Sequence, residues 1–377
     1  MARIFDLHGL VSLAVNGDRE QIVRDLETQL DPYEPSVGPV PAHADIVLNP
    51  KPSIVSRTLR DVHGPAGDGR RTGSDGRSCY LLRGNARFEL PRRYLQDGPV
   101  NLSYDPSFPL WEALSELVRP LLQLGTLARG AVTVHGATVE VEGSGLLVCG
   151  WAESGKTETA LALAEQGARF VSDKWTIIDS NASLHAFPVS VGIRDWVLQY
   201  LPRLRSHLRA SQRGRLRVAR AARRPMPLLT RRPTRIGTAL ESQLDRAFTL
   251  ASRLSLRQTE VGAIYGSSRD PNRTPPLKTL AMLTTVSTDE VTVRPAETGW
   301  AAERLARTAA YERRSLYELD ARARYADADP GPSSLADVRD LEAQQLRKVL
   351  KGVQVLEVNA PFPTDPRRVA DALAKWC

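Results

Sequence analysis

Residues 145–164 constrain the fold of this chain more than any other stretch. The run 146–149 is apolar and typical of a buried central strand, while 158–165 is rich in helix formers and is followed by Gly167, a residue that commonly ends helices. A tight loop with two glycines joins these two elements. A buried strand that turns directly into a helix predicts an α/β protein.

The loop has the spacing of a phosphate-binding loop. Gly150, Gly155, Lys156 and Thr157 fit the pattern G-x-x-x-x-G-K-[ST], in which loop amides and a helix N-terminus face nucleotide phosphates. The glycines let the backbone curl around an anion, the lysine charge faces the β and γ phosphates, and the threonine hydroxyl ligates Mg²⁺. The pattern therefore predicts binding of ATP and Mg²⁺. The alternative is an ordinary glycine-rich turn between a strand and a helix.

The chain has 377 residues, more than one hydrophobic core usually holds, so two domains are expected. We predict a smaller N-terminal α+β domain at 1–125 and a nucleotide-binding domain at 126–377, with an insertion at 203–235. No apolar run is long enough to cross a membrane and Asp6 interrupts the N-terminus, which predicts a soluble, cytoplasmic protein. The three cysteines lie far apart without metal-ligand spacing, and reduced thiols are expected at Cys79, Cys149 and Cys377.

Hydrophobic periodicity predicts further helices and strands along the chain. Helices are expected at 18–30, 109–128, 203–224, 238–254, 302–319, 335–350 and 366–376, the last with Asp365 as its N-cap. Strands are expected at 4–15, 44–48, 53–59, 79–82, 86–90, 131–142, 168–179, 276–285 and 352–358. Residues 63–78 are rich in Gly, Asp, Arg and Ser, which predicts a flexible loop. The isolated histidines His8, His43 and His63 are expected on the surface or in loops.

The formal net charge of +8 is concentrated in one segment. Residues 203–235 hold twelve arginines and no acidic residue or lysine, so the rest of the chain is mildly acidic. We predict a docking surface for an anionic partner, either an acidic peptide or nucleic acid, and the alternative is a solvated arm. Because the segment has no Phe, Tyr or Trp to stack on bases, a peptide or protein is favoured.

Two short segments flank the loop and carry polar residues. Residues 131–142 read as two strands with a turn at His135 and Gly136, and 168–179 read as two strands with a polar break around Asp173. An acidic residue at a strand end, one helix after a phosphate loop, is where such sites place Mg²⁺-binding or proton-accepting carboxylates. The alternative for Asp173 is a solvated carboxylate in a turn.

Together these segments resemble the catalytic domain of HPr kinase/phosphorylase. The likeness spans residues 135–173 and rests on His135-Gly136, on the loop with its run Gly-Lys-Thr-Glu-Thr-Ala-Leu, and on Gly167-x-Arg-Phe-Val-x-Asp. Residues 1–130 are similar to the β-rich N-terminal region of HPr-kinase-like proteins encoded with peptide-modifying and other specialised pathways. The resemblance implies a P-loop kinase core of the HPr kinase type that transfers the γ-phosphate of ATP to a hydroxyl group, with Ser or Thr of a peptide or protein as the expected acceptor.

The resemblance also implies roles for single residues. Lys156 matches the phosphate-binding lysine, and Thr157 and Glu158 match residues at the metal. Asp173 matches the first Asp of a pair, the expected general base and a metal ligand, while His135 matches an active-site histidine. Arg194 lies where relatives often carry an arginine near the phosphates, and it is included as a catalytic residue. The implied nucleotide-binding residues are Gly150, Trp151, Ala152, Glu153, Ser154, Gly155, Lys156, Thr157 and Glu158.

The chain departs from the family pattern at two positions. Glu153 stands where the family usually has glycine, which puts a negative charge close to a triphosphate unless the side chain points outward. Lys174 replaces the second Asp, so that Mg²⁺ has fewer acidic ligands or Lys174 itself neutralises phosphate. Two other functions stay open, a catalytically inactive nucleotide-sensing module and a nucleic-acid-associated P-loop ATPase. A homo-oligomer also stays open, and no membrane association is expected.

Overall fold

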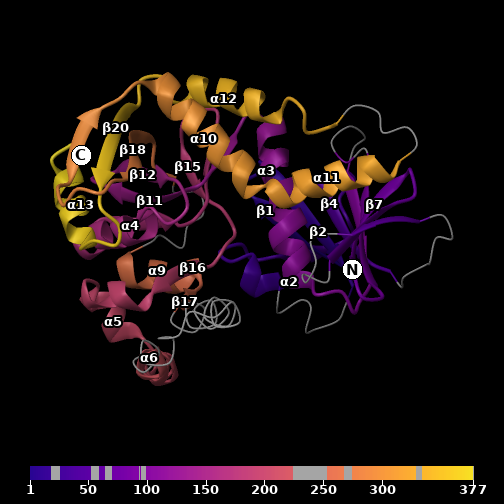
Figure 1. Ribbon diagram of the computed structural model, residues 1–377, viewed down its shortest axis with the longest axis horizontal. Coiled ribbons are helices and arrows are strands. Elements are labelled where there is room, and N and C mark those ends of the chain that lie inside the picture. The colour runs from indigo at the N-terminus through magenta and orange to yellow at the C-terminus, as the bar shows by residue number, and fades with distance from the viewer. Residues whose placement is uncertain are drawn as a thin grey trace, which may run out of the picture. The chain divides into compact units, whose positions relative to one another are not determined.

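The protein, described by a computed structural model, is a mixed α/β protein with several mixed sheets that contain parallel strands. The structure describes residues 1–17, 26–51, 59–63, 70–92, 94, 99–223, 253–266, 274–327 and 333–376. The chain forms two compact units that alternate along the sequence, as the colours of Figure 1 allow the reader to follow. Unit 1 comprises 1–135, 175–188 and 296–353, and unit 2 comprises 136–174, 189–295 and 354–377.

Unit 1 contains a nine-stranded sheet with the order β3-β1-β2-β4-β9-β8-β7-β6-β5. Its strands are β1 (Ala2–Leu7), β2 (Val11–Asn16), β3 (Ser36–Gly38), β4 (Ile46–Pro50), β5 (Arg60–His63), β6 (Arg70–Ser74), β7 (Ser78–Arg83), β8 (Ala86–Pro91) and β9 (Val100–Tyr104). β4 pairs in parallel with both β2 and β9, and the other pairs are antiparallel. In β8 the buried residues alternate with less buried ones, whereas successive residues of β7 are buried, so β7 is covered on both faces.

Unit 1 also contains the helical segments α2 (Leu110–Ala113), η1 (Leu114–Val118, a π-helix), α3 (Arg119–Ala128), α10 (Thr298–Glu312), α11 (Arg314–Ala326) and α12 (Val338–Val349). Two of them pack on the nine-stranded sheet, α3 against β2 and α11 against β5, β6 and β7. α3 contacts β2, and a Cβ at Gly125 would lie 2.7 Å from Cγ2 of Val11. Glycine at this position therefore permits the close approach of the helix to the strand.

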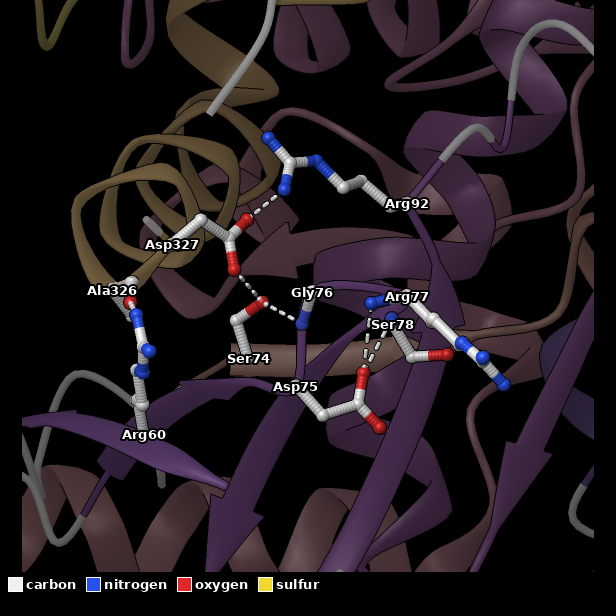
Figure 2. Close-up of polar contacts among 9 residues, drawn as sticks. All are labelled: Arg60, Ser74, Asp75, Gly76, Arg77, Ser78, Arg92, Ala326 and Asp327. Atoms are coloured by element: carbon white, nitrogen blue, oxygen red, sulfur yellow. Dashed lines mark hydrogen bonds and ion pairs between the residues drawn. The ribbon is translucent and has the colours of Figure 1, made fainter. Parts of the chain in front are cut away.

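The C-terminal end of α11 is attached to the sheet by side-chain contacts (Figure 2). Asp327 accepts a hydrogen bond from the Ser74 hydroxyl at 2.6 Å and forms an ion pair with Arg92. The guanidinium of Arg60 donates to the carbonyl oxygen of Ala326 at 3.1 Å. These contacts join α11 to β5, β6 and the residue after β8.

The turn between β6 and β7 is also closed by side chains, as Figure 2 shows. Asp75 accepts hydrogen bonds from the amides of Arg77 at 2.9 Å and Ser78 at 2.8 Å, and the Gly76 amide donates to Ser74 Oγ at 3.2 Å. The prediction of a flexible loop at 63–78 is wrong for residues 70–74, which form β6 and pair with strands on both sides. Residues 64–69 of that predicted loop lie outside the described residues.

A second, three-stranded sheet of unit 1 has the order β10-β14-β15 and contacts α10 and α12 through β10. Its strands are β10 (Val132–Val134), β14 (Thr176–Ile178) and β15 (Leu184–Ala186). Beside it Arg313, between α10 and α11, donates from its Nη1 to Glu342 of α12 at 2.7 Å. Both side chains are 1% exposed, so this ion pair is fully buried.

Unit 2 contains a six-stranded mixed sheet with the order β13-β11-β12-β18-β20-β19. Its strands are β11 (Gly136–Val141), β12 (Ser144–Gly150), β13 (Arg169–Ser172), β18 (Leu277–Thr285), β19 (Thr292–Pro295) and β20 (Gln354–Ala360). β12, β18 and β20 run in parallel, so the loops that follow them meet at one edge of the sheet.

Helix α4 (Lys156–Glu165) is buried on more than one side. Ala160 and Leu163 pack with α13 (Pro366–Ala374) and the sheet, whereas Leu161 and Ala164 pack into a second apolar cluster. That second cluster is supplied by β16 (Val191–Arg194), the 3₁₀ helix η2 (Asp195–Gln199), α5 (Pro202–His207), α6 (Ala210–Arg223), β17 (Arg253–Leu256) and α9 (Gln258–Tyr265). A helix that is apolar on several faces is expected to be enclosed in this way.

Several predicted elements are confirmed, including the strand and helix around the phosphate loop, β18, α12, β20 and α13. The predicted N-cap of α13 is confirmed as well, because the Asp365 side chain accepts a hydrogen bond from the Arg367 amide. The helix predicted at 302–319 is two helices that meet at Arg313, and the helix predicted at 203–224 is interrupted at Leu208, which is extended. Parts of other predicted segments lie outside the described residues, namely 18–25, 53–58, 224–235 and 238–252. The predicted helix at 238–254 is wrong at its end, because residues 253–256 form β17. None of the helices described in the structure is long and apolar enough to span a bilayer.

Candidate functional site

Two glycines let the chain pass from β12 through the phosphate loop into α4. Gly150 has a φ of 153°, and a Cβ there would lie 2.5 Å from Ser154 Oγ and 2.6 Å from the Leu283 carbonyl oxygen. Gly155 has a φ of 91°, and a Cβ there would lie 3.3 Å from the Phe362 ring. Both positions therefore favour glycine for steric reasons as well as for backbone conformation.

The loop is closed by Lys156 at the first position of α4. Its ammonium group donates to the carbonyl oxygen of Trp151 at 2.6 Å, and the side chain is buried. The hydroxyl of Ser154 is also buried, and it has no hydrogen-bond partner within the part of the chain that the structure describes. A buried hydroxyl without a partner, next to the first amides of a helix, fits a loop that receives an anionic group.

Thr157 and Asp173 form the central polar contact of the site. The Thr157 hydroxyl donates to Oδ1 of Asp173 at 2.7 Å, and Asp173 is only 2% exposed. Burial raises the pKa of the Asp173 carboxyl above its ordinary value, although the Thr157 bond and the Lys174 amide oppose that rise. Lys174 has a left-handed φ of 64° and accepts at its carbonyl from the Gly136 amide at 3.2 Å, which fixes the turn after β13.

Glu158 lies in the first turn of α4 and is buried. Burial raises the pKa of its carboxyl, and the nearby negative charge of Asp173 adds to this, while Arg194 and Lys156 lower it. Within the described residues, no group of three or more His, Cys, Asp or Glu side chains is arranged to hold a metal ion by itself. Mg²⁺ usually binds one or two carboxylates together with substrate phosphates and water, and Thr157, Glu158 and Asp173 fit that donor set.

Glu153 points toward Arg194 at the edge of the loop. A nitrogen of Arg194 lies 2.7 Å from Glu153 Oε1, and the two side chains are 33% and 72% exposed. The Arg194 guanidinium also lies 5.5 Å from the centre of the Phe362 ring. Glu153 has a φ of 63°, a left-handed conformation that is uncommon outside glycine. The negative charge of Glu153 is therefore paired with a cation.

His135 belongs to unit 1, whereas the phosphate loop, Asp173 and Arg194 belong to unit 2. The His135 ring is buried, its Nδ1 lies 3.5 Å from Oε1 of Glu312, and its centre lies 5.1 Å from that of Trp175. The structure thus brings Glu153, Lys156, Thr157, Glu158, Asp173 and Arg194 together in one unit. The role of His135 stays a prediction.

Two aromatic residues beside the loop were missed at the sequence level. Phe362 follows β20 and contacts the position of Gly155, and Trp196 packs edge-on against it with ring centres 5.9 Å apart. The strand predicted at 352–358 could have located Phe362, because the loops that follow neighbouring parallel strands meet at one edge of the sheet.

Comparison with protein-family models and with curated protein sequences finds no match to this chain.

Proposed function

We propose that this protein is an ATP- and Mg²⁺-dependent kinase with a P-loop kinase core of the HPr kinase type, which transfers the γ-phosphate to a hydroxyl group. The observation that carries the proposal is the hydrogen bond between Thr157 of the phosphate loop and the buried Asp173. This contact joins the loop that would hold the phosphates to a carboxylate that can accept a proton. The left-handed glycines and the partnerless Ser154 hydroxyl support the same reading of the loop.

Each residue has a defined task in this mechanism. The loop amides and Lys156, released from the Trp151 carbonyl, bind the β and γ phosphates. Thr157, Glu158 and Asp173 would hold Mg²⁺, which supplies charge neutralisation on the phosphate oxygens when it is bound. Asp173 orients the acceptor hydroxyl and takes its proton, and its raised pKa makes it a stronger base than an exposed carboxylate.

The acceptor in this proposal is Ser or Thr of a peptide or protein, with an acidic sequence that docks on the basic segment 203–235, of which 224–235 lie outside the described residues. Arg194 supplies positive charge near the transferred group once its ion pair with Glu153 opens. The cytoplasm is the proposed compartment.

The test is incubation of the protein with γ-labelled ATP, Mg²⁺ and Ser-containing peptides, followed by mass analysis of the products. Calorimetry with ATP accompanies it, because Lys156→Ala should remove most of the nucleotide affinity by deleting the charge aimed at the phosphates. Unchanged ATP affinity in that variant would refute the phosphate-loop assignment.

A second candidate is a nucleotide sensor that binds ATP without transfer. It is favoured by Lys174, whose positive charge lies next to Asp173 and lowers its pKa against the effect of burial. Tight ATP binding by wild type, with no phosphorylated product from any hydroxyl acceptor, would select this candidate over the kinase.

A further inference from the structure

A groove of about 620 Å³ lies in unit 2 between η2, α5 and α6. It is lined by Leu198, Gln199, Pro202, Arg205, Ser206, Ala210, Arg213, Gly214 and Arg217. Three of these residues are arginines and none is acidic. The volume falls in the range of ordinary ligand sites, roughly 300–1,000 Å³.

The three groove arginines differ in their contacts from several other arginines of unit 2 that the structure describes. Arg194, Arg209 and Arg294 pair with carboxylates, and Arg215 donates to the Arg253 carbonyl at 2.8 Å. In the part of the chain that the structure describes, the side chains of Arg205, Arg213 and Arg217 form neither a hydrogen bond nor an ion pair. Three arginines that line one groove, and whose guanidinium groups form no ion pair with the described side chains, offer donors for carboxylates or phosphates.

The groove side of α6 also contains Gly214. Residues 210, 213, 214 and 217 have the spacing of one helix face, and Leu216 on another face is buried in the apolar cluster. A Cβ at Gly214 would meet nothing within 4 Å, so no packing constraint requires glycine there. Glycine inside a helix is less favourable than alanine, and its effect here is to leave the groove open.

The groove is fixed to the helix that follows the phosphate loop. Glu165 at the end of α4 accepts from the amides of Arg203 and Leu204, each at 3.2 Å, and from the Tyr265 hydroxyl at 2.6 Å. The 3₁₀ helix η2, which supplies one wall, begins directly after Arg194. A segment bound in the groove would therefore be held in the same unit as the phosphate loop.

We propose that this groove binds an acidic peptide segment of the acceptor protein, an inference that rests on the proposed kinase function. Carboxylates match the three arginines in charge and in hydrogen-bonding geometry. We favour a peptide over a nucleic acid as the bound molecule, because the groove lining has no aromatic side chain on which bases could stack. The apolar wall of Leu198, Pro202 and Ala210 suits aliphatic parts of a peptide.

The test measures binding of a fluorescein-labelled oligoglutamate peptide to the full chain by fluorescence anisotropy, at low and at high ionic strength. Wild type should bind it, and added salt should weaken binding. The variant R205S/R213S/R217S should bind at least about tenfold more weakly, because it removes three charged hydrogen-bond donors from the groove. Its ATP affinity should be unchanged.

Two further variants distinguish peptide binding in the groove from a general effect of the protein's net charge. R257Q/K278Q/R294Q removes the same charge from exposed positions outside the groove and should bind the peptide as wild type does. Gly214→Phe fills the groove without removing charge, raises helix propensity, and should weaken binding about as much as the arginine variant. Equal losses in the groove variant and the charge-matched control would overturn the proposal, as would tighter binding of single-stranded DNA than of oligoglutamate.

A transfer assay separates this inference from the kinase proposal. Two Ser peptides are compared, one flanked by Glu and one by Gln. Preference for the Glu peptide that disappears in R205S/R213S/R217S supports the groove. Equal phosphorylation of both peptides would overturn the proposed role of the groove but leave the proposed kinase activity intact. Binding of oligoglutamate without any phosphate transfer would support the groove as a peptide site and refute the kinase activity.

Discussion

The Thr157 hydroxyl donates to the buried carboxylate of Asp173 at 2.7 Å, so the first turn of α4 and the end of β13 are joined at the phosphate loop. The two residues are separated by a whole helix and a strand in sequence. In the folded unit they form a contact that can serve both a metal ion and an acceptor hydroxyl. Substitutions at this contact therefore discriminate best between a kinase and a nucleotide sensor.

Asp173→Asn should lower phosphate transfer by roughly 10²- to 10⁴-fold, because an amide cannot accept the hydroxyl proton. The amide oxygen can still accept the Thr157 hydrogen bond and can still serve as an oxygen ligand for Mg²⁺, so ATP affinity should change little. Rates with γ-labelled ATP and calorimetry with ATP and Mg²⁺ provide the two measurements. Asp371→Asn is the control, because Asp371 is exposed and contacts Gln166 at the far end of α4. A variant that loses ATP affinity but transfers at the wild-type rate would contradict the assignment of Asp173 as the base.

Much of this site could be predicted because its pieces are local in sequence. The glycine spacing, Lys156 and Thr157 lie within one loop, and Asp173 follows one helix later. The pairing of Glu153 with Arg194 could not be predicted, since it joins residues that only the packing of β16 brings near the loop. The break at Arg313 was missed for the same reason. Residues 302–319 contain no Gly or Pro that would signal the end of a helix, and Glu342, the partner of Arg313, lies in another helix.

Glu153→Gly should increase ATP affinity by roughly threefold to tenfold. The substitution removes a negative charge near the phosphates and frees Arg194 to face them. The change in stability should stay within about 1 kcal/mol, because glycine relieves the left-handed backbone while the lost ion pair is exposed. Glu142→Gly is a matched control, since Glu142 also has a left-handed φ, 49°, but lies before β12. Calorimetry that shows weaker ATP binding in Glu153→Gly would mean that the ion pair supports the binding-competent loop.

Glu342→Ala should lower the free energy of unfolding by about 3–5 kcal/mol, because it leaves the buried Arg313 charge without its partner. The double variant Arg313→Met/Glu342→Leu should recover most of this loss, since neither buried charge remains. Denaturant titration gives both values. Asp340→Asn, which breaks an exposed pair with Arg339, should change stability by less than about 1 kcal/mol. Equal effects at positions 342 and 340 would show that burial does not decide the contribution of the pair.

His8 lies in the turn between β1 and β2, as the expectation of a loop histidine allows, but its ring is enclosed by other side chains. The ring centre lies 4.5 Å from that of His185 and 5.2 Å from that of Tyr33, and His185 Nε2 lies 2.9 Å from Asp179 Oδ2. Burial, followed by the charge of His185, lowers the pKa of His8 from 6.5 to about 4. Protonation of His8 is therefore less favourable in the folded state than in the unfolded state.

Between pH 6.5 and about 4, His8 is protonated in the unfolded chain but neutral in the folded chain. The free energy of unfolding therefore falls as the pH falls through this window. His8→Asn removes the titrating group and tolerates the left-handed φ of 58°. As the pH falls through this window, the free energy of unfolding of His8→Asn should exceed that of wild type by a growing amount. The increase should reach up to about 3 kcal/mol, at about 1.4 kcal/mol per unit of pKa difference between the folded and unfolded states. Urea titrations across the window, with the exposed His43→Asn as control, measure the difference. A difference between wild type and His8→Asn that stays constant with pH would show that His8 is not held neutral by its surroundings.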